Sequence, residues 1–322
     1  MLATLCFVLV SLAADQTAGH EILTLEQEVG AKAEDRLALD ALLTQAKVEL
    51  VAPKKPNKDG VKAFLTAARN LVISQGFREA ESPSEEPELL CRALQAKVFD
   101  CDTLSFILVS MAEELNFPLK GTMAPGHMFV IWSKKKEVLL WDSRSGEECE
   151  YTKAHGFLHL VTPLSPPYNL KPLSHKELVA CGWYNVAAVV AIEQGKYSRA
   201  LEISHKVMRE NPNLLVAQVL RGNCFQNLGN LQQAEKDYLK VIKKNPQCLQ
   251  VWCAVSQFWS FQGDLGQAID AVSKAIEIAP DDADLYLWRG IKFQERGNAG
   301  DYELAEADFG RVLQLDPVFL AG

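Results

Sequence analysis

The chain has 322 residues, of which 48% are hydrophobic and 23% charged, a balance typical of packed globular structure and a length sufficient for two structural units. Its formal net charge of -8 comes without a long basic run, which excludes nucleic acid as an expected partner because phosphate binding needs a basic surface.

Residues 1–18 are predicted to form a secretory signal peptide. An apolar stretch over residues 1–14 ends in small side chains just before Asp15, a pattern that precedes leader cleavage and is too short for a stable transmembrane helix. We therefore expect export, to the periplasm or out of the cell, and no transmembrane span once the leader is removed. Because no Lys or Arg precedes the apolar run, an ordinary N-terminal helix and a mis-assigned start stay open as alternatives.

Seven cysteines follow the leader, without a CxxC pair or a zinc-like cluster. We expect neither a disulfide framework nor a structural zinc site, and no cofactor. Three of the seven fall where a repeat array uses small buried side chains, so packing is their expected role: Cys224, Cys248 and Cys253.

The first part of the following unit, residues 19–165, is expected to be helical. Apolar residues recur at helical spacing from Glu21 to Leu50, which predicts a pair of helices. A linker with two prolines follows at 51–60, then an amphipathic helix through Phe64 and Leu71. A second break at 81–87 leads to the segment that carries the candidate chemistry.

An apolar helix is predicted from Cys101 to Leu115. Asp100 is its expected N-cap, so that Cys101 lies in the first turn, and the near-continuous hydrophobic run favours burial on most sides. Strand-like runs follow at 119–123, 128–132 and 137–141, with a turn at 133–136. We therefore expect a helix that leads into an antiparallel sheet.

The strand register brings two polar side chains together. A hairpin whose loop is centred between Lys134 and Lys135 pairs residues whose numbers sum to 269, and His127 and Asp142 have this sum. We expect them directly opposite each other, with Cβ atoms about 4.5 to 5.5 Å apart. A slip by one residue would send the two side chains to opposite faces of the sheet.

Cys101, His127 and Asp142 are the candidate catalytic residues. A thiol nucleophile needs a base to take its proton and a group that orients the base, roles that Cys101, His127 and Asp142 would fill in this order. The start of a helix lowers a thiol pKa and offers backbone N–H groups to an oxyanion. The structural alternative is a core cysteine, a hydrogen-bonded histidine and an aspartate that caps the turn at 143–146.

Three motifs resemble the Cys, His and Asp motifs of the transglutaminase-like superfamily, a branch of the papain-like fold: Phe99–Thr103, Ala124–Val130 and Leu140–Gly146. The resemblance covers residues 88–146. It implies an α+β domain of the cysteine-protease type whose triad attacks amide or peptide bonds, by hydrolysis or acyl transfer. The segment also resembles transglutaminase-like units of bacterial proteins that carry tetratricopeptide repeats.

The residues around Cys101 raise two points against a reactive thiol. One is the charge of its neighbours, and the other is the alternative of a metal site. Asp100 and Asp102 flank Cys101, and their negative charges disfavour a thiolate. The same three side chains could ligate zinc, although their spacing matches no compact metal signature, so no metal site is expected.

The second half of the chain repeats every 34 residues. Gly195, Gly229, Gly263 and Gly297 keep this step, as do three prolines, and three extra residues follow Gly297 in the last unit. This period is typical of tetratricopeptide repeats, each a pair of helices, and predicts an all-α solenoid of about four repeats over residues 166–322. Such arrays commonly bind a peptide or a partner protein, and the alternative is a purely structural extension or self-association.

Two hypotheses about function follow from these observations. The first is an exported transglutaminase-like thiol hydrolase or acyl transferase whose repeats recruit a protein or peptide. The second is a non-enzymatic adaptor with a degenerate transglutaminase-like unit and a peptide-binding repeat groove. No polar helix follows Pro317, which predicts a missing segment, a dimer contact through the last repeat or packing against another domain.

Overall fold

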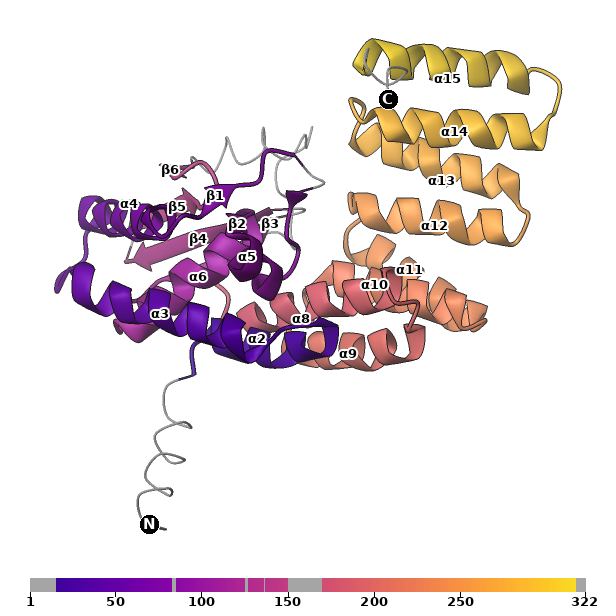
Figure 1. The fold of residues 1–322 in the computed structure, drawn as a ribbon. Helices are drawn as coiled ribbons and strands as arrows, with labels where there is room; N and C mark the ends of the chain where they lie inside the picture. The colour runs from indigo at the N-terminus through magenta and orange to yellow at the C-terminus, as the bar shows by residue number, and fades with distance from the viewer. Residues whose placement is uncertain (1–15, 83–84, 125–126, 136, 150–169, 317–322) are drawn as a thin grey trace. The chain divides into compact units, whose positions relative to one another are not determined.

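The computed structural model describes residues 16–316 except 83–84, 125–126, 136 and 150–169. These residues form two units, and Figure 1 shows both. Unit 1 contains the described residues up to 149 together with 170–212, and unit 2 contains 213–316. The last residues, 317–322, on which the expectation of an uncapped repeat rests, lie outside the described residues.

The start of unit 1 overlaps the predicted leader, whose residues 1–15 lie outside the described residues. Thr17 is the N-cap of helix α2 (Ala18–Glu26). Ala18 is buried, and its N–H donates to Glu113 Oε2 at 2.7 Å. A leader that ended at residue 18 would remove this contact, so the fold of unit 1 begins before the predicted boundary.

Helices make up most of the first half of unit 1. The predicted pair corresponds to α2 and α3 (Ala33–Glu49), joined by the short 3-10 helix η1 (Gln27–Val29). The amphipathic helix is α4 (Lys58–Ser74), which begins inside the predicted linker because the Asn57 side chain caps it by accepting the N–H of Gly60 at 2.9 Å.

Helix α6 (Cys101–Glu114) is the central element of unit 1. Every residue from Thr103 to Ala112 is buried, because α6 packs against α2, α3 and α4 and against the strands β3 and β4. The predicted N-cap is confirmed, since Asp100 Oδ1 accepts the N–H of Thr103 at 2.8 Å. Burial on this scale removes large apolar side chains from water at a gain of roughly 1.5 to 3 kcal/mol each.

The main sheet is antiparallel, in the order β3-β4-β5-β6 (Figure 1). The three predicted strands are confirmed as β3 (Lys120–Ala124), β4 (His127–Lys134) and β5 (Glu137–Asp142). Four short elements were not predicted, because two to seven residues are too few to show a period: β6 (Glu147–Glu148), the parallel pair β1 (Arg78–Glu79) and β2 (Val98–Phe99), and α5 (Leu90–Ala96).

The predicted strand register is wrong by two residues. Lys134 pairs with Glu137 and Val130 with Trp141, so the numbers of paired residues sum to 271 rather than 269. The turn after β4 is therefore centred one position later than loop symmetry suggested. A shift of two keeps every side chain on its predicted face, because strand side chains alternate with a period of two. His127 and Asp142 become diagonal neighbours on one face instead of direct partners.

Two further helices, α8 (His175–Ile192) and α9 (Tyr197–Glu210), belong to unit 1. Helix α8 packs against α2 and β3. The contact with β3 is so close that a Cβ at Gly121 would lie 2.6 Å from Leu178 Cδ1. The predicted boundary at residue 165 lies outside the described residues, and the first predicted repeat groups with unit 1 rather than with the other repeats.

His175 ties the start of α8 to two other helices. Its Nδ1 lies 2.7 Å from Glu113 Oε1 of α6, and its Nε2 lies 3.0 Å from Glu21 Oε1 of α2. The hydrogen bond to Glu113, followed by the bond to Glu21, raises the pKa of His175 to about 9 against the opposing effect of burial. At neutral pH the imidazolium therefore bridges two carboxylates.

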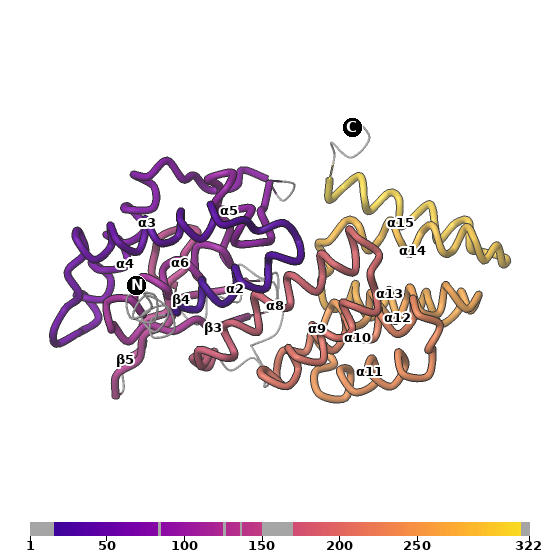
Figure 2. The backbone as a smooth tube through the Cα atoms, turned by 60° about the horizontal axis from the view of Figure 1, so that its bottom comes forward, coloured from indigo at the N-terminus to yellow at the C-terminus, as the bar shows by residue number. Residues whose placement is uncertain are grey.

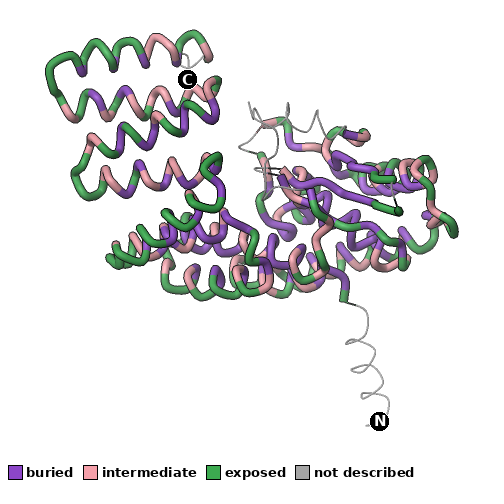
Figure 3. Tube along the Cα trace, turned by 180° about the vertical axis from the view of Figure 1, so that it is seen from behind, coloured by how far each residue is buried: buried purple, intermediate pink, exposed green. Residues whose placement is uncertain are grey.

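Unit 2 consists of three helix pairs, as the 34-residue period predicts (Figure 2). Glycines with positive φ, among them Gly229 at 79° and Gly263 at 81°, close the turns within the pairs. Buried and exposed residues alternate along each helix (Figure 3). The helices are α10 (Leu215–Asn227), α11 (Leu231–Lys244), α12 (Leu249–Phe261), α13 (Leu265–Ile278), α14 (Ala283–Arg296) and α15 (Asp301–Leu315).

Buried ion pairs join the two helices in the first and last pairs of unit 2. Arg221 of α10 donates from Nε to Asp237 Oδ2 of α11 at 2.7 Å. Arg289 of α14 makes the equivalent bidentate contact to Asp308 of α15, at 2.8 and 2.7 Å. Both aspartates are buried, so each depends on its arginine for charge compensation.

The same two helix pairs also combine a glycine with an aromatic ring. A Cβ at Gly222 would lie 2.5 Å from the ring of Tyr238, and one at Gly290 would lie 2.6 Å from the ring of Phe309. The missing side chain on the first helix therefore makes the space that the ring of the second helix fills.

The middle pair, α12 and α13, replaces all four of these side chains. Val255 and Ala271 stand where the other pairs have arginine and aspartate, and Ser256 and Val272 stand where they have glycine and an aromatic residue. The arginine and its aspartate are replaced together, and so are the glycine and the aromatic residue that packs against it. Each helix pair is thus packed in one of two self-consistent ways.

We predict that Arg289→Val destabilises the protein by about 2 to 4 kcal/mol, because it leaves the buried Asp308 carboxylate without its counter-ion. Adding Asp308→Ala, which reproduces the apolar combination of the middle pair, should recover more than half of the loss. Urea unfolding of both variants measures this. Equal destabilisation by the single and double changes would contradict the prediction.

We predict a pH-dependent contribution from His175. Its pKa is raised in the folded state, so the folded protein binds this proton more tightly, and the stabilisation is full below about pH 6.5 and is lost as the pH rises through about 9. The stability difference between the unaltered protein and His175→Gln, from urea unfolding at about pH 6, 7.5 and 9.5, should shrink across this series. A difference that stays constant with pH would rule out the bridging role.

Candidate functional site

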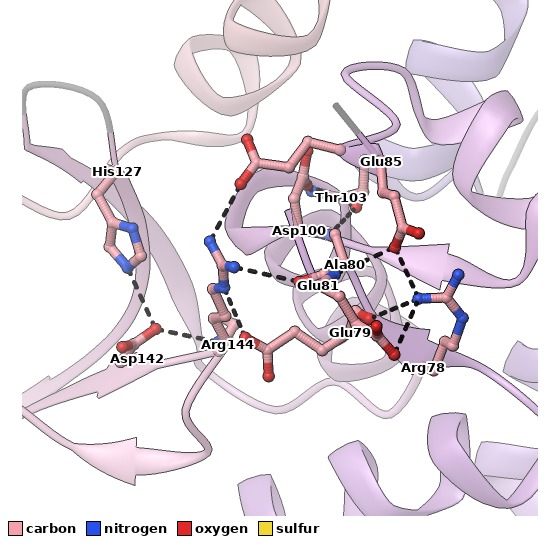
Figure 4. Close-up of polar contacts among 12 residues, drawn as sticks. Arg78, Glu79, Ala80, Glu81, Glu85, Asp100, Thr103, His127, Asp142 and Arg144 are labelled. Carbon is pink, nitrogen blue, oxygen red and sulfur yellow. Dashed lines mark hydrogen bonds and ion pairs between the residues drawn. The ribbon is translucent and has the colours of Figure 1, made fainter. Parts of the chain in front are cut away.

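His127 and Asp142 form a hydrogen-bonded pair at the ends of neighbouring strands (Figure 4). His127 is the first residue of β4 and Asp142 the last of β5, and Nε2 lies 3.1 Å from Oδ1. The imidazole also meets the ring of Phe129 edge-on, with centroids 4.4 Å apart. The carboxylate on Nε2 favours the tautomer with its proton there, which leaves Nδ1 as the basic nitrogen.

The Asp142 carboxylate is buried and stays ionised. Burial alone would raise its pKa, but hydrogen bonds from His127, from the N–H of Arg144 at 3.0 Å and from the Ser145 hydroxyl lower it below its usual value. A buried carboxylate that keeps its charge holds an imidazole in a fixed orientation.

The turn after Asp142 is fixed from two sides. Arg69 of α4 donates to the carbonyl of Ser143 at 3.2 Å and to that of Arg144 at 2.7 Å. The hydroxyl of Ser143 lies 2.7 Å from that of Ser105 in α6. These contacts connect the turn that carries Asp142 with the helix that carries Cys101.

The Arg144 side chain points toward the end of β1 and the segment that follows it (Figure 4). Its Nε donates to Glu79 at 2.6 Å, and its two terminal nitrogens donate to Glu86 at 3.1 Å and to the carbonyl of Ala80 at 3.2 Å. The guanidinium is thereby held by two carboxylates close to the thiol of Cys101, with which it interacts electrostatically.

Cys101 lies close to the first residues of β4, at the backbone N–H of Met128. It is the first residue of α6, and its sulfur accepts the backbone N–H of Met128, the residue that follows His127. All three predicted side chains therefore gather around the first residues of β4. Strand β4 begins with the residue that carries the imidazole, and α6 begins with the partly buried thiol.

The charges around Cys101 oppose ionisation of the thiol. Its Sγ lies 3.4 Å from Asp102 Oδ1. Burial, followed by the negative charge of Asp102 and then that of Asp100, raises the pKa of the thiol well above its usual range, and the N–H of Met128 offsets only part of this. The sulfur therefore remains a protonated thiol at neutral pH, as the flanking carboxylates led us to expect.

Helix α8 supplies neighbours of the Asp102 carboxylate that no sequence pattern predicted. The side chain of Asn185 hydrogen-bonds to Asp102 and also donates to the carbonyl of Glu88 at 3.0 Å. Cys181 lies near the same carboxylate. Burial and the charge of Asp100 raise the pKa of Asp102 to about 6. No sequence pattern linked α8 to the thiol, because some eighty positions separate them.

The described part of the chain lacks both a cluster of metal ligands and a membrane-spanning helix. No three His, Cys, Asp or Glu side chains there are arranged so that they could hold a metal ion. No helix in the same residues combines the length and the apolar character needed to cross a bilayer.

Comparison with known proteins identifies the repeats of unit 2. The tetratricopeptide repeat family model matches residues 216–247, which span α10 and α11. Human tetratricopeptide repeat protein 16 is 30% identical over 141 residues, which are 42% of this chain and 16% of that protein.

Two relatives from Schizosaccharomyces pombe match similar lengths. The general transcriptional corepressor ssn6 is 27% identical over 121 residues, 38% of this chain and 11% of that protein. The DnaJ homolog subfamily C member 7 homolog is 28% identical over 156 residues, 44% of this chain and 32% of that protein. The chain thus spans about a third or less of the length of these relatives.

Among solved structures, MamA from Desulfovibrio magneticus RS-1 is 19% identical, with 44% of this chain and 77% of that chain covered and a TM-score of 0.37. YrrB, described as a TPR protein with an unusual peptide-binding site, is 14% identical, with 45% and 77% covered and a TM-score of 0.35. The expected transglutaminase-like unit receives no support from the matches named here and stays a prediction. The family match and the helix pairs of unit 2 agree: the chain carries tetratricopeptide repeats, a class of repeat that mediates protein–protein interaction.

Proposed function

We propose that the protein is a non-enzymatic adaptor whose repeats hold a protein or peptide partner, while the transglutaminase-like part of unit 1 is a degenerate companion. The observation that carries this proposal is the state of Cys101, a partly buried thiol in contact with the Asp102 carboxylate. We further propose that the protein acts outside the cytoplasm, on the basis of the apolar residues 1–14.

The chemistry of thiols supports the adaptor. Only a thiolate is a strong nucleophile, and cysteines that act as nucleophiles have positive groups that lower the thiol pKa. Here two aspartates lie next to the sulfur in sequence, and the nearby Arg144 is already paired with Glu79 and Glu86. The positive charge that could favour a thiolate is therefore compensated by other carboxylates.

The repeats offer an apolar surface for a partner on α12 and α14. Lys292 donates to Ser260 Oγ at 2.7 Å, which brings these two helices together in unit 2. Phe261, which follows Ser260 in α12, is 68% exposed, and Ile291, which precedes Lys292 in α14, is 40% exposed. Exposed apolar side chains at one place on a repeat array mark a surface for a partner.

A second candidate function is a thiol hydrolase or acyl transferase that acts on amide bonds. It is favoured by the 3.1 Å contact between His127 and Asp142 and by the N–H of Met128 at the thiol. In this reaction the Cys101 sulfur would attack the carbonyl carbon, His127 would take the thiol proton and later protonate the leaving amine, and Asp142 would orient the imidazole.

The adaptor predicts that partner capture depends on the repeats and not on the thiol. With the tagged full-length protein and chemical crosslinking, Phe261→Ser combined with Ile291→Ser should reduce the captured protein by about fivefold or more, through loss of apolar contact area. Cys101→Ser should capture as much as the unaltered protein.

The matched control is Leu37→Ser combined with Val48→Ser, which removes two exposed apolar side chains from α3. This control should not change capture. Loss of capture in Cys101→Ser, or full capture by the Phe261 and Ile291 double variant, would count against the adaptor.

We predict that Asp102 suppresses the reactivity of Cys101. Asp102→Asn removes the nearest negative charge, so Cys101 should react with iodoacetamide about tenfold faster at about pH 8, as measured by mass spectrometry of its peptide. Asp59→Asn, an exposed change in α4, should leave the rate unchanged.

In the unaltered protein, Cys101 should react no faster than Cys253, which is also partly buried. A Cys101 that reacts about tenfold faster than Cys253 would overturn the adaptor in favour of the thiol enzyme.

A further inference from the structure

Helix α11 has a basic outer face that the equivalent helices lack. Four lysines, Lys236, Lys240, Lys243 and Lys244, are exposed on it. Within the described part of the chain, none of the four makes an ion pair or a side-chain hydrogen bond. In a protein with a formal net charge of -8, this cluster, the basic face, is unusual.

The second helices of the other repeats, α9, α13 and α15, provide a comparison within the same chain. Their long cations all have partners: Arg199 with Glu28 and Glu202, Lys206 with the ring of Trp183, Arg209 with Glu210, Lys274 with Glu277, and Arg311 with Asp281. A cation with a partner is therefore the ordinary state of this helix in the array, and α11 departs from it.

The lysines of the basic face share one side of the helix. At 1.5 Å per residue they extend over about 12 Å, and their spacing of three and four residues aligns them. The opposite side is fixed in the core of unit 2, where Ala234, Tyr238 and Val241 are buried. The apolar side of α11 is buried, so the surface that it offers to a partner consists of the four lysines, the exposed Leu239 and the exposed polar residues Gln232, Gln233 and Glu235.

We propose that the basic face is a docking site for an acidic segment of a protein partner. An acidic segment would place several carboxylates along these 12 Å and gain ion pairs that no residue of the described chain supplies. This occupant is favoured over an anionic membrane because α11 has no free apolar side to insert, and over nucleic acid because the net charge is negative.

The inference deepens the proposed adaptor function, on which it rests, by naming the chemistry of a partner. It concerns a surface on α11, whereas partner capture was assigned to Phe261 of α12 and Ile291 of α14. The two proposals can therefore fail separately.

Binding of a fluorescein-labelled deca-glutamate peptide to the full-length protein, measured by fluorescence anisotropy at low salt, tests the basic face. Lys236→Gln, Lys240→Gln and Lys243→Gln together should weaken binding about tenfold, since three exposed ion pairs are lost. The control removes the same charge elsewhere, by Lys54→Gln, Lys55→Gln and Lys176→Gln, and should bind within about twofold of the unaltered protein.

Equal weakening of peptide binding in both triple variants would show that only net charge matters and would overturn the proposal. Unchanged binding in the α11 variant would also overturn it. Vesicles of phosphatidylserine and phosphatidylcholine form a second arm, and binding to vesicles without binding to the peptide would assign the basic face to membranes instead. Loss of peptide binding with crosslinked capture intact would support the basic face independently of the α12 and α14 surface.

Discussion

Burial of helix α6 is the constraint on which unit 1 depends. The helix is enclosed by α2, α3 and α4 and by two strands, and its capping by Asp100 fixes where it begins. As the first residue of α6, Cys101 therefore lies in a poorly solvated position beside two carboxylates. Burial and the negative charges of these carboxylates raise the pKa of its thiol. The packing that places the thiol at the backbone of Met128, the residue after His127, is thus the same packing that keeps the sulfur protonated, and geometry and electrostatics point to different functions.

The sequence predicted the residues of the candidate site better than it predicted the register of the two strands that carry His127 and Asp142. Asp100 as cap, the central helix and three strands were foreseeable because each leaves a local pattern. The hairpin register was wrong by two, since lysines in a turn give no information about which of them pair. His127 and Asp142 still meet at 3.1 Å, because an even shift preserves the face on which a strand side chain lies.

Contacts between distant segments were beyond prediction. The 34-residue period revealed the helix pairs of unit 2, but nothing in it indicated that α8 would pack on β3 and bring Asn185 to Asp102. The arginines that fix the turn after Asp142 were equally hidden. Arg69 forms its bonds across 74 and 75 positions, and Arg144 reaches across 65 positions to Glu79 in β1, which is too short to show a period.

The two packing modes of the helix pairs have a consequence for how such an array can diverge. Arginine, glycine, aspartate and an aromatic residue occur together in α10/α11 and in α14/α15, and all four are exchanged in α12/α13. Intermediate combinations would pass through an uncompensated charge or a steric clash. Substitutions at these four positions should consequently be inherited as a block, so that whole helix pairs, rather than single residues, are the units that duplication and recombination can exchange.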